Sequence, residues 1–140
     1  MRYLFLSILL VVSCTPQKSD QSNLENDFLH AAKHFHELYI QAGDCEERNA
    51  MIDRDIIFFE NGQPFTYENI LEYCSYIQPK LAFNIYSKQY RIEPTIGFDY
   101  VEQYFINPEM DTLCETTSRI WQFKSERWVV THMEVSRQPV

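Results

Sequence analysis

The chain has 140 residues, a formal net charge of −8 and a hydrophobic content of 45%. An acidic excess of this size opposes binding to phosphate backbones, so nucleic acid is excluded as a partner. The apolar content excludes disorder throughout the chain, and the length excludes a multidomain enzyme.

Residues 1–13 differ in composition from everything that follows. They carry one charge, at Arg2, and then an almost unbroken apolar run from Tyr3 to Val12. A membrane-spanning helix needs about 20 such residues, so this shorter run predicts an export signal peptide rather than an anchor helix. Residues 14–140 then have the length of one ordinary domain.

Cys14 follows the residues Val11-Val12-Ser13, and this stretch resembles a bacterial lipobox. The resemblance implies that Cys14 becomes the acylated N-terminus of a lipoprotein, held to a membrane surface by its acyl chains. An ordinary secretory signal with an incidental cysteine is the alternative. We therefore expect a lipid-anchored protein of the bacterial cell envelope, on the periplasmic or cell-surface side, in which residues 14–23 form the lipidated cysteine and a flexible tether.

Three further cysteines, Cys45, Cys74 and Cys114, would then lie in an oxidising compartment. An odd number cannot pair completely within one chain. One disulfide with one free thiol, or three buried thiols, both agree with the sequence. The spacings fit neither a zinc site nor a redox pair.

Helical periodicity dominates the start of the mature chain. Ser22 and Glu25 fit a capping box, and the apolar spacing behind them predicts a helix over residues 24–42, ended by Gly43. The apolar stripe consists of Leu24, Phe28, Ala31, Phe35, Leu38 and Ala42, with Tyr39 beside it.

Shorter elements follow this helix. Asp44 is placed to cap a short second helix, and residues 53–60 read as a strand. Asn61-Gly62 is the strongest short signal for a hairpin turn, so a second short strand is expected after it. Thr66 is then placed to cap a third helix.

From Leu81 onward, aromatic and aliphatic residues alternate with polar ones. This alternation predicts four strands at residues 82–92, 96–106, 112–123 and 128–135. Helices followed by a run of strands indicate an α+β domain, with the N-terminal helices packed on a curved antiparallel sheet.

The two C-terminal segments, residues 117–123 and 126–136, resemble the end of a nuclear transport factor 2-like domain. An Arg-x-Trp strand, a charged turn and a strand containing Trp, His and Ser occur in the order typical of the SnoaL-like and kinase-association branches, with Glu134 in place of a second histidine. The resemblance covers residues 24–140 and implies a cone-shaped scaffold. That scaffold hosts isomerases, dehydratases, cyclases, binding domains and oligomerisation modules.

Strand register decides which side chains face the mouth of such a cone, where ligands usually lie. A two-residue turn between Lys124 and Arg127 places Arg119 opposite His132 on one face. The same extrapolation places Tyr100 near Arg119 on the preceding strand. A bulge in either strand would reverse the assignment.

This predicted register suggests a functional role for each candidate site residue on the strands. Arg119 is predicted to hold an acidic group by two parallel hydrogen bonds, or else to form an ion pair with Glu102 or Glu115. His132 is the candidate catalytic base, or else a structural residue at a subunit interface. The predicted ligand-binding residues are Arg119, Tyr100, Glu102 and Tyr39.

His30 and His34 lie one helical turn apart, with Asp27 one turn earlier. Such a pattern can chelate a metal ion, but all three residues lie opposite the apolar stripe, and a solvated helix face explains them. We therefore expect no metal and no cofactor.

Two functional hypotheses follow. The first is a membrane-tethered lipoprotein whose domain binds a small ligand or mediates dimerisation. A homodimer is expected because Trp128 and Val130 are placed on a sheet face that no later helix covers. The alternative is a small cofactor-free isomerase, dehydratase or hydrolase, with His132 as base and Arg119 orienting an acidic substrate. A third hypothesis is an immunity protein or another protein that acts by binding a partner protein.

Overall fold

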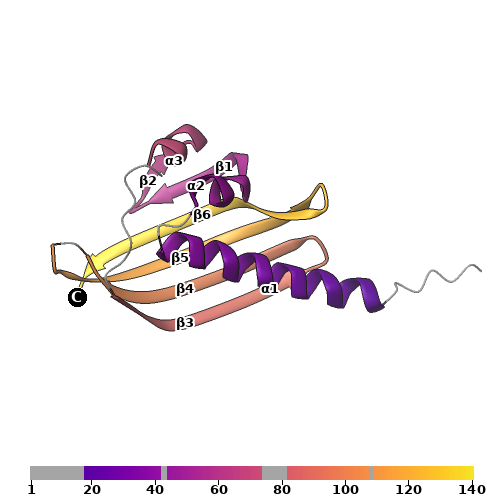
Figure 1. Ribbon diagram of the computed structural model, residues 1–140, viewed down its shortest axis with the longest axis horizontal. Helices are drawn as coiled ribbons and strands as arrows, with labels where there is room; N and C mark the ends of the chain where they lie inside the picture. Colours follow the sequence, from indigo (N-terminus) through magenta and orange to yellow (C-terminus); the bar gives the residue numbers. More distant parts are fainter. Residues whose placement is uncertain (1–17, 42–43, 74–81, 108) are drawn as a thin grey trace, which may run out of the picture.

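Helices and strands follow one another in the order expected from the sequence. The computed structural model describes residues 18–41, 44–73, 82–107 and 109–140. Its elements are α1 (Lys18–Ile40), α2 (Cys45–Ala50), β1 (Ile52–Glu60), β2 (Gln63–Phe65), α3 (Tyr67–Tyr73), β3 (Ala82–Glu93), β4 (Ile96–Ile106), β5 (Thr112–Lys124) and β6 (Arg127–Pro139) (Figure 1). The α+β class is confirmed.

The strands form one six-stranded sheet in the order β2-β1-β6-β5-β4-β3. β3 to β6 make an antiparallel meander, as expected. β1, however, pairs parallel with β6, so the curved sheet, expected to be antiparallel, is mixed at this one strand pair. The meander leaves one edge of β6 without a partner, and the β1–β2 hairpin supplies its hydrogen bonds.

Both predicted two-residue turns are present. Asn61 and Gly62 have φ values of 49° and 76°, the left-handed backbone that a type I′ hairpin requires. The turn between β5 and β6 has the same form at Ser125 and Glu126, with φ values of 48° and 62°. These turns set the register at the start of each hairpin.

The two short helices begin where their caps predict. The carboxylate of Asp44 accepts hydrogen bonds from the backbone N–H groups of Glu46 and Glu47 at 2.8 and 3.1 Å. Thr66 and Asn69 cap α3 reciprocally: the N–H of Asn69 donates to the Thr66 hydroxyl, and the N–H of Thr66 donates to the Asn69 side chain. Each cap satisfies backbone donors that a helix leaves unpaired.

α1 begins earlier than predicted. Its first residue is Lys18, so residues 18–23 of the predicted tether are helical. No Gly or Pro follows Pro16 before the apolar stripe, and a helix extends at little cost once it has formed. The predicted stop at Gly43 lies outside the described residues.

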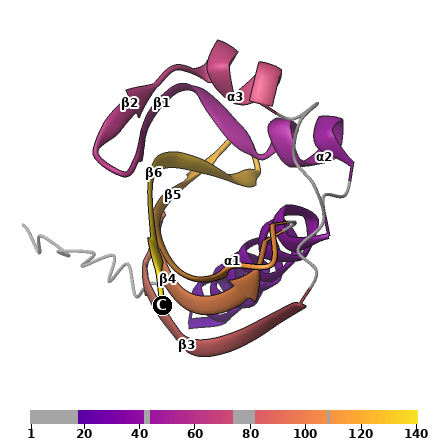
Figure 2. The same cartoon turned by 90° about the vertical axis from the view of Figure 1, so that its left-hand side faces the viewer.

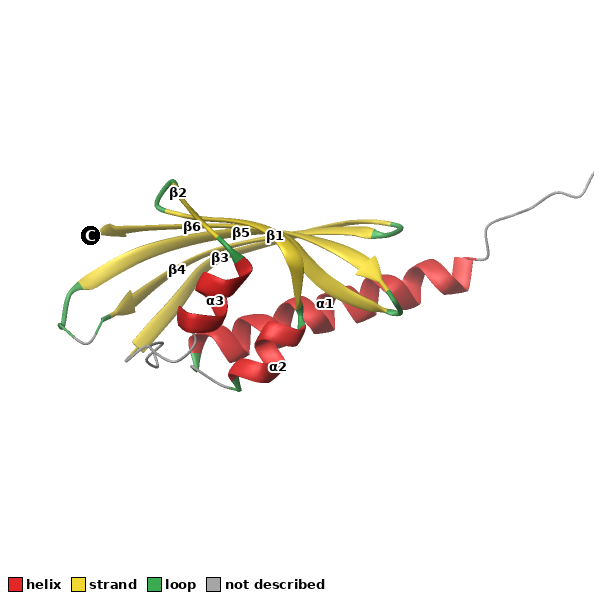
Figure 3. Cartoon of the chain, turned by 90° about the horizontal axis from the view of Figure 1, so that it is seen from above, coloured by secondary structure: helices red, strands yellow, loops and turns green. Residues whose placement is uncertain are grey.

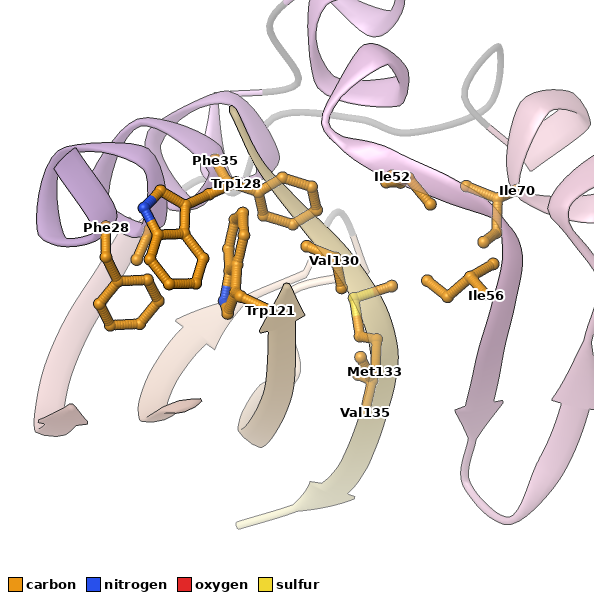
Figure 4. Packing of buried hydrophobic residues seen from close by; sticks show 11 residues of the cluster. Phe28, Phe35, Ile52, Ile56, Ile70, Trp121, Trp128, Val130, Met133 and Val135 are labelled. Atoms are coloured by element: carbon orange, nitrogen blue, oxygen red, sulfur yellow. The ribbon is translucent and has the colours of Figure 1, made fainter. Parts of the chain in front are cut away.

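The core lies between α1 and the concave face of the sheet (Figure 4). Phe28 contacts Trp121 and Trp128 with ring centroids 6.1 and 5.2 Å apart, and Phe35 meets Trp121 edge-on at 5.5 Å. Trp128 and Val130 are only 4% and 0% exposed. The expectation that these two residues lie on an uncovered face is therefore wrong, because α1 covers them.

All three helices lie on one side of the sheet, and its convex side carries no helix of the described chain (Figures 2 and 3). Exposed apolar side chains lie on that convex side, among them Ile57, Ile96, Phe98 and Ile120. Within the described ranges, none of the helices combines the length and apolar character that a membrane span requires.

The cysteines follow the first of the two expected arrangements. Cys45, the first residue of α2, is disulfide-bonded, and Cys114 on β5 is a buried free thiol. Cys74 and Cys14 lie outside the described residues.

Gly97 generates a test of the core. A Cβ at this position on β4 would lie 2.3 Å from the ring carbon Cε2 of Phe28. We expect Gly97→Ala to lower the free energy of unfolding by about 1–3 kcal/mol in urea denaturation, because the ring has no room to retreat beneath α1. Adding Phe28→Leu should recover part of this loss. If Gly97→Ala lowers the free energy of unfolding equally in the wild-type and Phe28→Leu backgrounds, the clash is not with the Phe28 ring.

Candidate ligand-binding cavity

A cavity of about 40 Å³ lies where α1, α3, β1 and β6 meet. It has room for about three water-sized atoms. Its wall is mainly apolar and is formed by Phe35, Ile52, Phe58, Phe65, Ile70, Met133 and Val135. The polar side chains of the wall are Tyr39, Arg48, Glu60, Asn69 and Arg137.

Arg137 on β6 organises the polar part of the wall. One of its terminal nitrogens donates to the carboxylate of Glu60, and the other donates to the Tyr39 hydroxyl at 2.6 Å. Its Nε donates to Glu115 at 2.6 Å. The guanidinium thus joins α1, β1 and β5, and its planar set of donors suits this three-way arrangement.

Glu115 is a fully buried carboxylate behind the wall. It accepts hydrogen bonds from Tyr39 at 3.0 Å, from the amide nitrogen of Gln103 at 2.5 Å and from Arg137. A buried carboxylate without such partners would be strongly destabilising. The network therefore keeps a charge inside the cone and holds the Tyr39 side chain in one orientation.

The pKa of Tyr39 is raised above its usual value of about 10. Burial is the largest cause, and the neighbouring carboxylate of Glu115 adds to it, while Arg137 opposes it. The phenol therefore stays protonated at every physiological pH. It donates to Glu115 and accepts from Arg137.

Arg48 reaches the cavity from α2. Its side chain is buried, its terminal nitrogen lies 3.4 Å from the side-chain oxygen of Asn49, and burial lowers its pKa. Arg48 thus places a second guanidinium on the wall of the cavity, beside that of Arg137.

A second buried cluster lies beneath α1, on the other side of the cavity residue Phe35. Arg119 donates from Nε to both oxygens of Asp99 at 3.0 and 3.1 Å, and from a terminal nitrogen to the same carboxylate. The indole nitrogen of Trp121 donates to Asp99 at 2.5 Å. Phe35 covers the guanidinium, with the ring centroid 5.1 Å from its central carbon. Arg119 thus has an internal partner, and that partner is neither Glu102 nor Glu115.

The predicted meeting of Arg119 and His132 does not occur. The register holds near the turn, where Trp121 faces Val130, but a bulge at Thr131 of β6 places Ile120 opposite His132 and Arg119 opposite Met133. His132 therefore projects from the convex face, whereas Arg119 is buried under the concave one. The two residues cannot act together on one substrate.

Tyr100 and Glu102 also lie away from the cavity. The loop after β4 shifts the predicted register by one residue, so Asp99 faces Arg119 and Tyr100 faces Ser118. Both predicted ligand-binding residues are on the convex face, where the Tyr100 hydroxyl lies 3.4 Å from Glu102. Among the predicted ligand-binding residues, Tyr39 lines the cavity.

His30 and His34 line a separate surface groove of about 440 Å³ between α1 and the β5–β6 turn. The Nε2 atom of His34 lies 2.8 Å from the carboxylate of Glu47 on α2. Among the residues that the structure describes, no three His, Cys, Asp or Glu side chains come together as metal ligands.

Sequence reasoning missed most of the polar wall, namely Arg48, Glu60, Asn69 and Arg137, with Glu115 and Gln103 behind it. One signal was present: Gln103, Glu115 and Arg137 occupy strand positions that share a face with apolar core residues. A charged residue on an inward-facing position indicates a buried pair, once the register is known.

A curved sheet wrapped around a helix, with a cavity inside, defines a cone-shaped α+β domain. Solved structures identify this shape as the nuclear transport factor 2-like fold, and the resemblance noted in residues 117–136 is confirmed at the level of the fold. No protein-family model and no curated protein sequence matches the chain.

Three solved structures illustrate the range of similar proteins. A cystatin-like fold protein from Burkholderia xenovorans aligns at a TM-score of 0.69 and 13% identity, covering 86% of this chain and 96% of that one. A candidate ketosteroid isomerase from Shewanella frigidimarina aligns at 0.67 and 14%, covering 76% and 92%. The association domain of CaMKII from C. elegans aligns at 0.62 and 14%, covering 85% and 99%. Identities this low establish the fold alone.

The raised pKa of Tyr39 generates a test in alkaline solution. The folded protein keeps this proton at pH values where the unfolded chain has lost it, so the free energy of unfolding should fall above about pH 10, by up to about 1.4 kcal/mol per pH unit from this group. We expect Tyr39→Phe to show a shallower fall between pH 10 and 11.5 in urea denaturation. At neutral pH the variant should be less stable by roughly 1–2 kcal/mol, since Arg137 and Glu115 lose a partner.

Tyr100→Phe is the matched control for this experiment. The pKa of Tyr100 is also raised, mainly by burial, but the residue is only half-buried on the convex face. Tyr100→Phe should therefore change the fall of the unfolding free energy above pH 10 less than Tyr39→Phe does. A wild-type slope in Tyr39→Phe would refute the role assigned to the buried phenol.

Proposed function

We propose that the chain is a membrane-tethered ligand-binding domain and that its ligand occupies the cavity between α1, α3 and β6. The observation that carries this proposal is a mainly apolar cavity with a few polar groups fixed on one wall. This combination is typical of small-molecule sites, in which apolar surface supplies affinity and oriented polar groups supply specificity.

The chemistry of the wall favours a neutral ligand. Two guanidinium groups, Arg48 and Arg137, are balanced by two carboxylates, Glu60 and Glu115. A charged ligand would add an uncompensated charge to a site with little water, which is costly. A small molecule with an apolar body and one oxygen acceptor near Arg48 suits the wall. The enclosed volume admits a small group, or one end of a larger molecule.

The partners of the carboxylates favour binding over proton abstraction. Among the described residues of the wall, Glu60 is the carboxylate, and an oxygen of its side chain is paired with Arg137. Glu115, behind the wall, is paired with Arg137 in the same way and also accepts from Tyr39 and Gln103. Both carboxylates thus have structural partners within the protein.

The tether is proposed to be an acylated Cys14. The lipobox-like residues before it and the apolar run at residues 3–12 support this assignment. α1 begins at the far end of the molecule from α2 and α3 (Figure 1), and the cavity residues Phe35 and Tyr39 lie in its last turns. A lipid anchor preceding α1 would thus keep the cavity away from the membrane surface.

The convex face is proposed to pair with a second copy of the chain. Phe98, Ile120, His132 and Ile57 lie side by side in register on four neighbouring strands. Phe98, Ile120 and Ile57 are 37%, 41% and 56% exposed. An apolar row of this kind on an uncovered sheet marks an interaction surface.

Charges at the two ends of this convex row favour a second copy as the occupant. Arg91 lies beside Phe98 at the β3 end, where it forms an exposed ion pair with Glu93 at 3.2 Å, whereas Glu134 and Asp55 lie near the β1 end. A two-fold axis parallel to the strands lays the β3 end of one copy over the β1 end of the other, so that Arg91 of one copy meets the acidic end of its partner.

Ligand binding is tested by thermal denaturation of the purified chain with a panel of short-chain ketones, alcohols, amides and carboxylic acids. We expect neutral oxygen-bearing molecules to raise the melting temperature in proportion to the logarithm of their concentration above Kd. Stabilisation by the acids alone would contradict the neutral assignment. Native mass spectrometry of protein purified from its own host should show the bound mass.

A variant pair on α3 locates this binding. Ile70→Phe adds bulk to the buried wall and should abolish the shift, whereas Leu71→Phe, on the next and exposed residue, should retain it. Circular dichroism checks that both variants are folded. Equal shifts in the two variants would place the ligand elsewhere.

The tether is tested by fractionation of cells. Cys14→Ala should move the protein from the membrane fraction to the soluble fraction of the envelope, because acyl chains contribute roughly 0.8 kcal/mol per buried CH₂. Ser13→Ala, which keeps the cysteine and a small residue before it, should leave the membrane fraction unchanged. Retention of the Cys14→Ala protein on membranes would disprove acylation as the anchor.

Pairing is tested by sedimentation equilibrium of the full chain in density-matched detergent. The protein should sediment as a dimer, and Ile120→Asp should weaken the dimer at least about a hundredfold, since a carboxylate would be buried in an apolar contact. Gln122→Asp, at an exposed position two residues further on the same face, is the charge control and should have a smaller effect. A monomeric wild-type protein would rule out the pairing.

A further inference from the structure

His132 occupies an unusual position in the convex row. It is the one polar member, half-buried, directly between Ile120 on β5 and Ile57 on β1. Its ring lies 6.5 Å from the ring of Phe59 on β1. The cavity and the two buried ion pairs do not involve this side chain.

We infer that protonation of His132 opens the paired state, so that the convex faces separate in mildly acidic surroundings. The inference rests on the proposed pairing through the convex face. Histidine is the side chain that changes charge between about pH 5 and pH 8, and a cell envelope is exposed to the pH outside.

The physical reason lies in the surroundings of the ring. In a single copy, a protonated His132 remains in contact with water and lies near Glu134 on its own strand. In the pair, the apolar side chains of both rows replace that water. A charge enclosed in this way loses solvation that a neutral imidazole does not need.

The charged groups around His132 are few. Glu134 lies two residues after it on β6, Asp55 lies two residues before Ile57 on β1, and Arg91 lies at the far end of the row on β3, paired with Glu93. β5 and β4 present Ser118, Ile120, Phe98 and Tyr100.

The experiment measures the dimer dissociation constant of the full chain in density-matched detergent at pH 7.5 and pH 5.5. Free Asp and Glu side chains stay largely ionised at the lower value. Each dimer contains two copies of His132. We expect the dimer dissociation constant to rise about tenfold for each copy between pH 7.5 and pH 5.5, and so roughly a hundredfold in total. Circular dichroism at both pH values confirms that the chain stays folded.

Two histidine variants separate His132 from the other titrating groups. His132→Gln keeps a polar side chain without a charge, and its dimer should be equally tight at both pH values. His34→Gln removes a histidine that lies on α1 beside Glu47, on the helix side of the sheet, and should keep the wild-type pH response.

The outcomes distinguish this inference from the proposed pairing. A wild-type protein that is monomeric at pH 7.5 overturns both. A dimer of equal strength at pH 7.5 and 5.5, or one that tightens in acid, overturns the role of His132 and leaves the pairing intact. A pH response that persists in His132→Gln likewise overturns the role of His132 and leaves the pairing intact.

Discussion

Burial of opposite charges on the concave face is the constraint on which the rest of the structure depends. Arg119 and Arg137 both lie inside the curved sheet, and each faces a carboxylate across a strand pair, Asp99 or Glu115. Leaving one member of such a pair alone typically costs about 3–5 kcal/mol. Because side chains alternate between the faces, a slip of β5 by one residue against its two neighbours would separate both pairs at once. The two ion pairs thereby fix the register of β4, β5 and β6, and with it the core and the cavity.

Local signals in the sequence predict the elements well. Caps at Asp44 and Thr66, the Asn61-Gly62 turn and period-two alternation place the elements within a few residues, apart from the earlier start of α1. Two features leave no local trace. The bulge in β6 falls where Thr131 and His132 both fit a strand, and the parallel partner of β1 is decided by which edge of the meander remains open.

The same distinction explains what could be predicted of the site. Tyr39 lies beside the apolar stripe of α1, so helical spacing alone directs it inward. Its partners Glu115 and Arg137 come from strands far along the chain, and their meeting depends on a register that sequence gives only near the turns. Arg119 occupies an inward position, as predicted. Its partner is Asp99 rather than the predicted neighbour Tyr100, because the loop after β4 shifts the register by one residue. A role can therefore be assigned to a strand residue from the sequence only where the turn that sets its register is known and no bulge lies between them.

The place of β6 in the sheet has a consequence for how the chain folds. It is the last strand to be synthesised, yet it lies between β5 and β1, so the N-terminal hairpin has no strand to join until the C-terminus exists. Contacts of such long sequence separation form slowly. The strand order therefore makes the contact between β1 and β6 a late event in folding, and the sheet gains its β1–β2 edge only after the meander of β3 to β6 has formed.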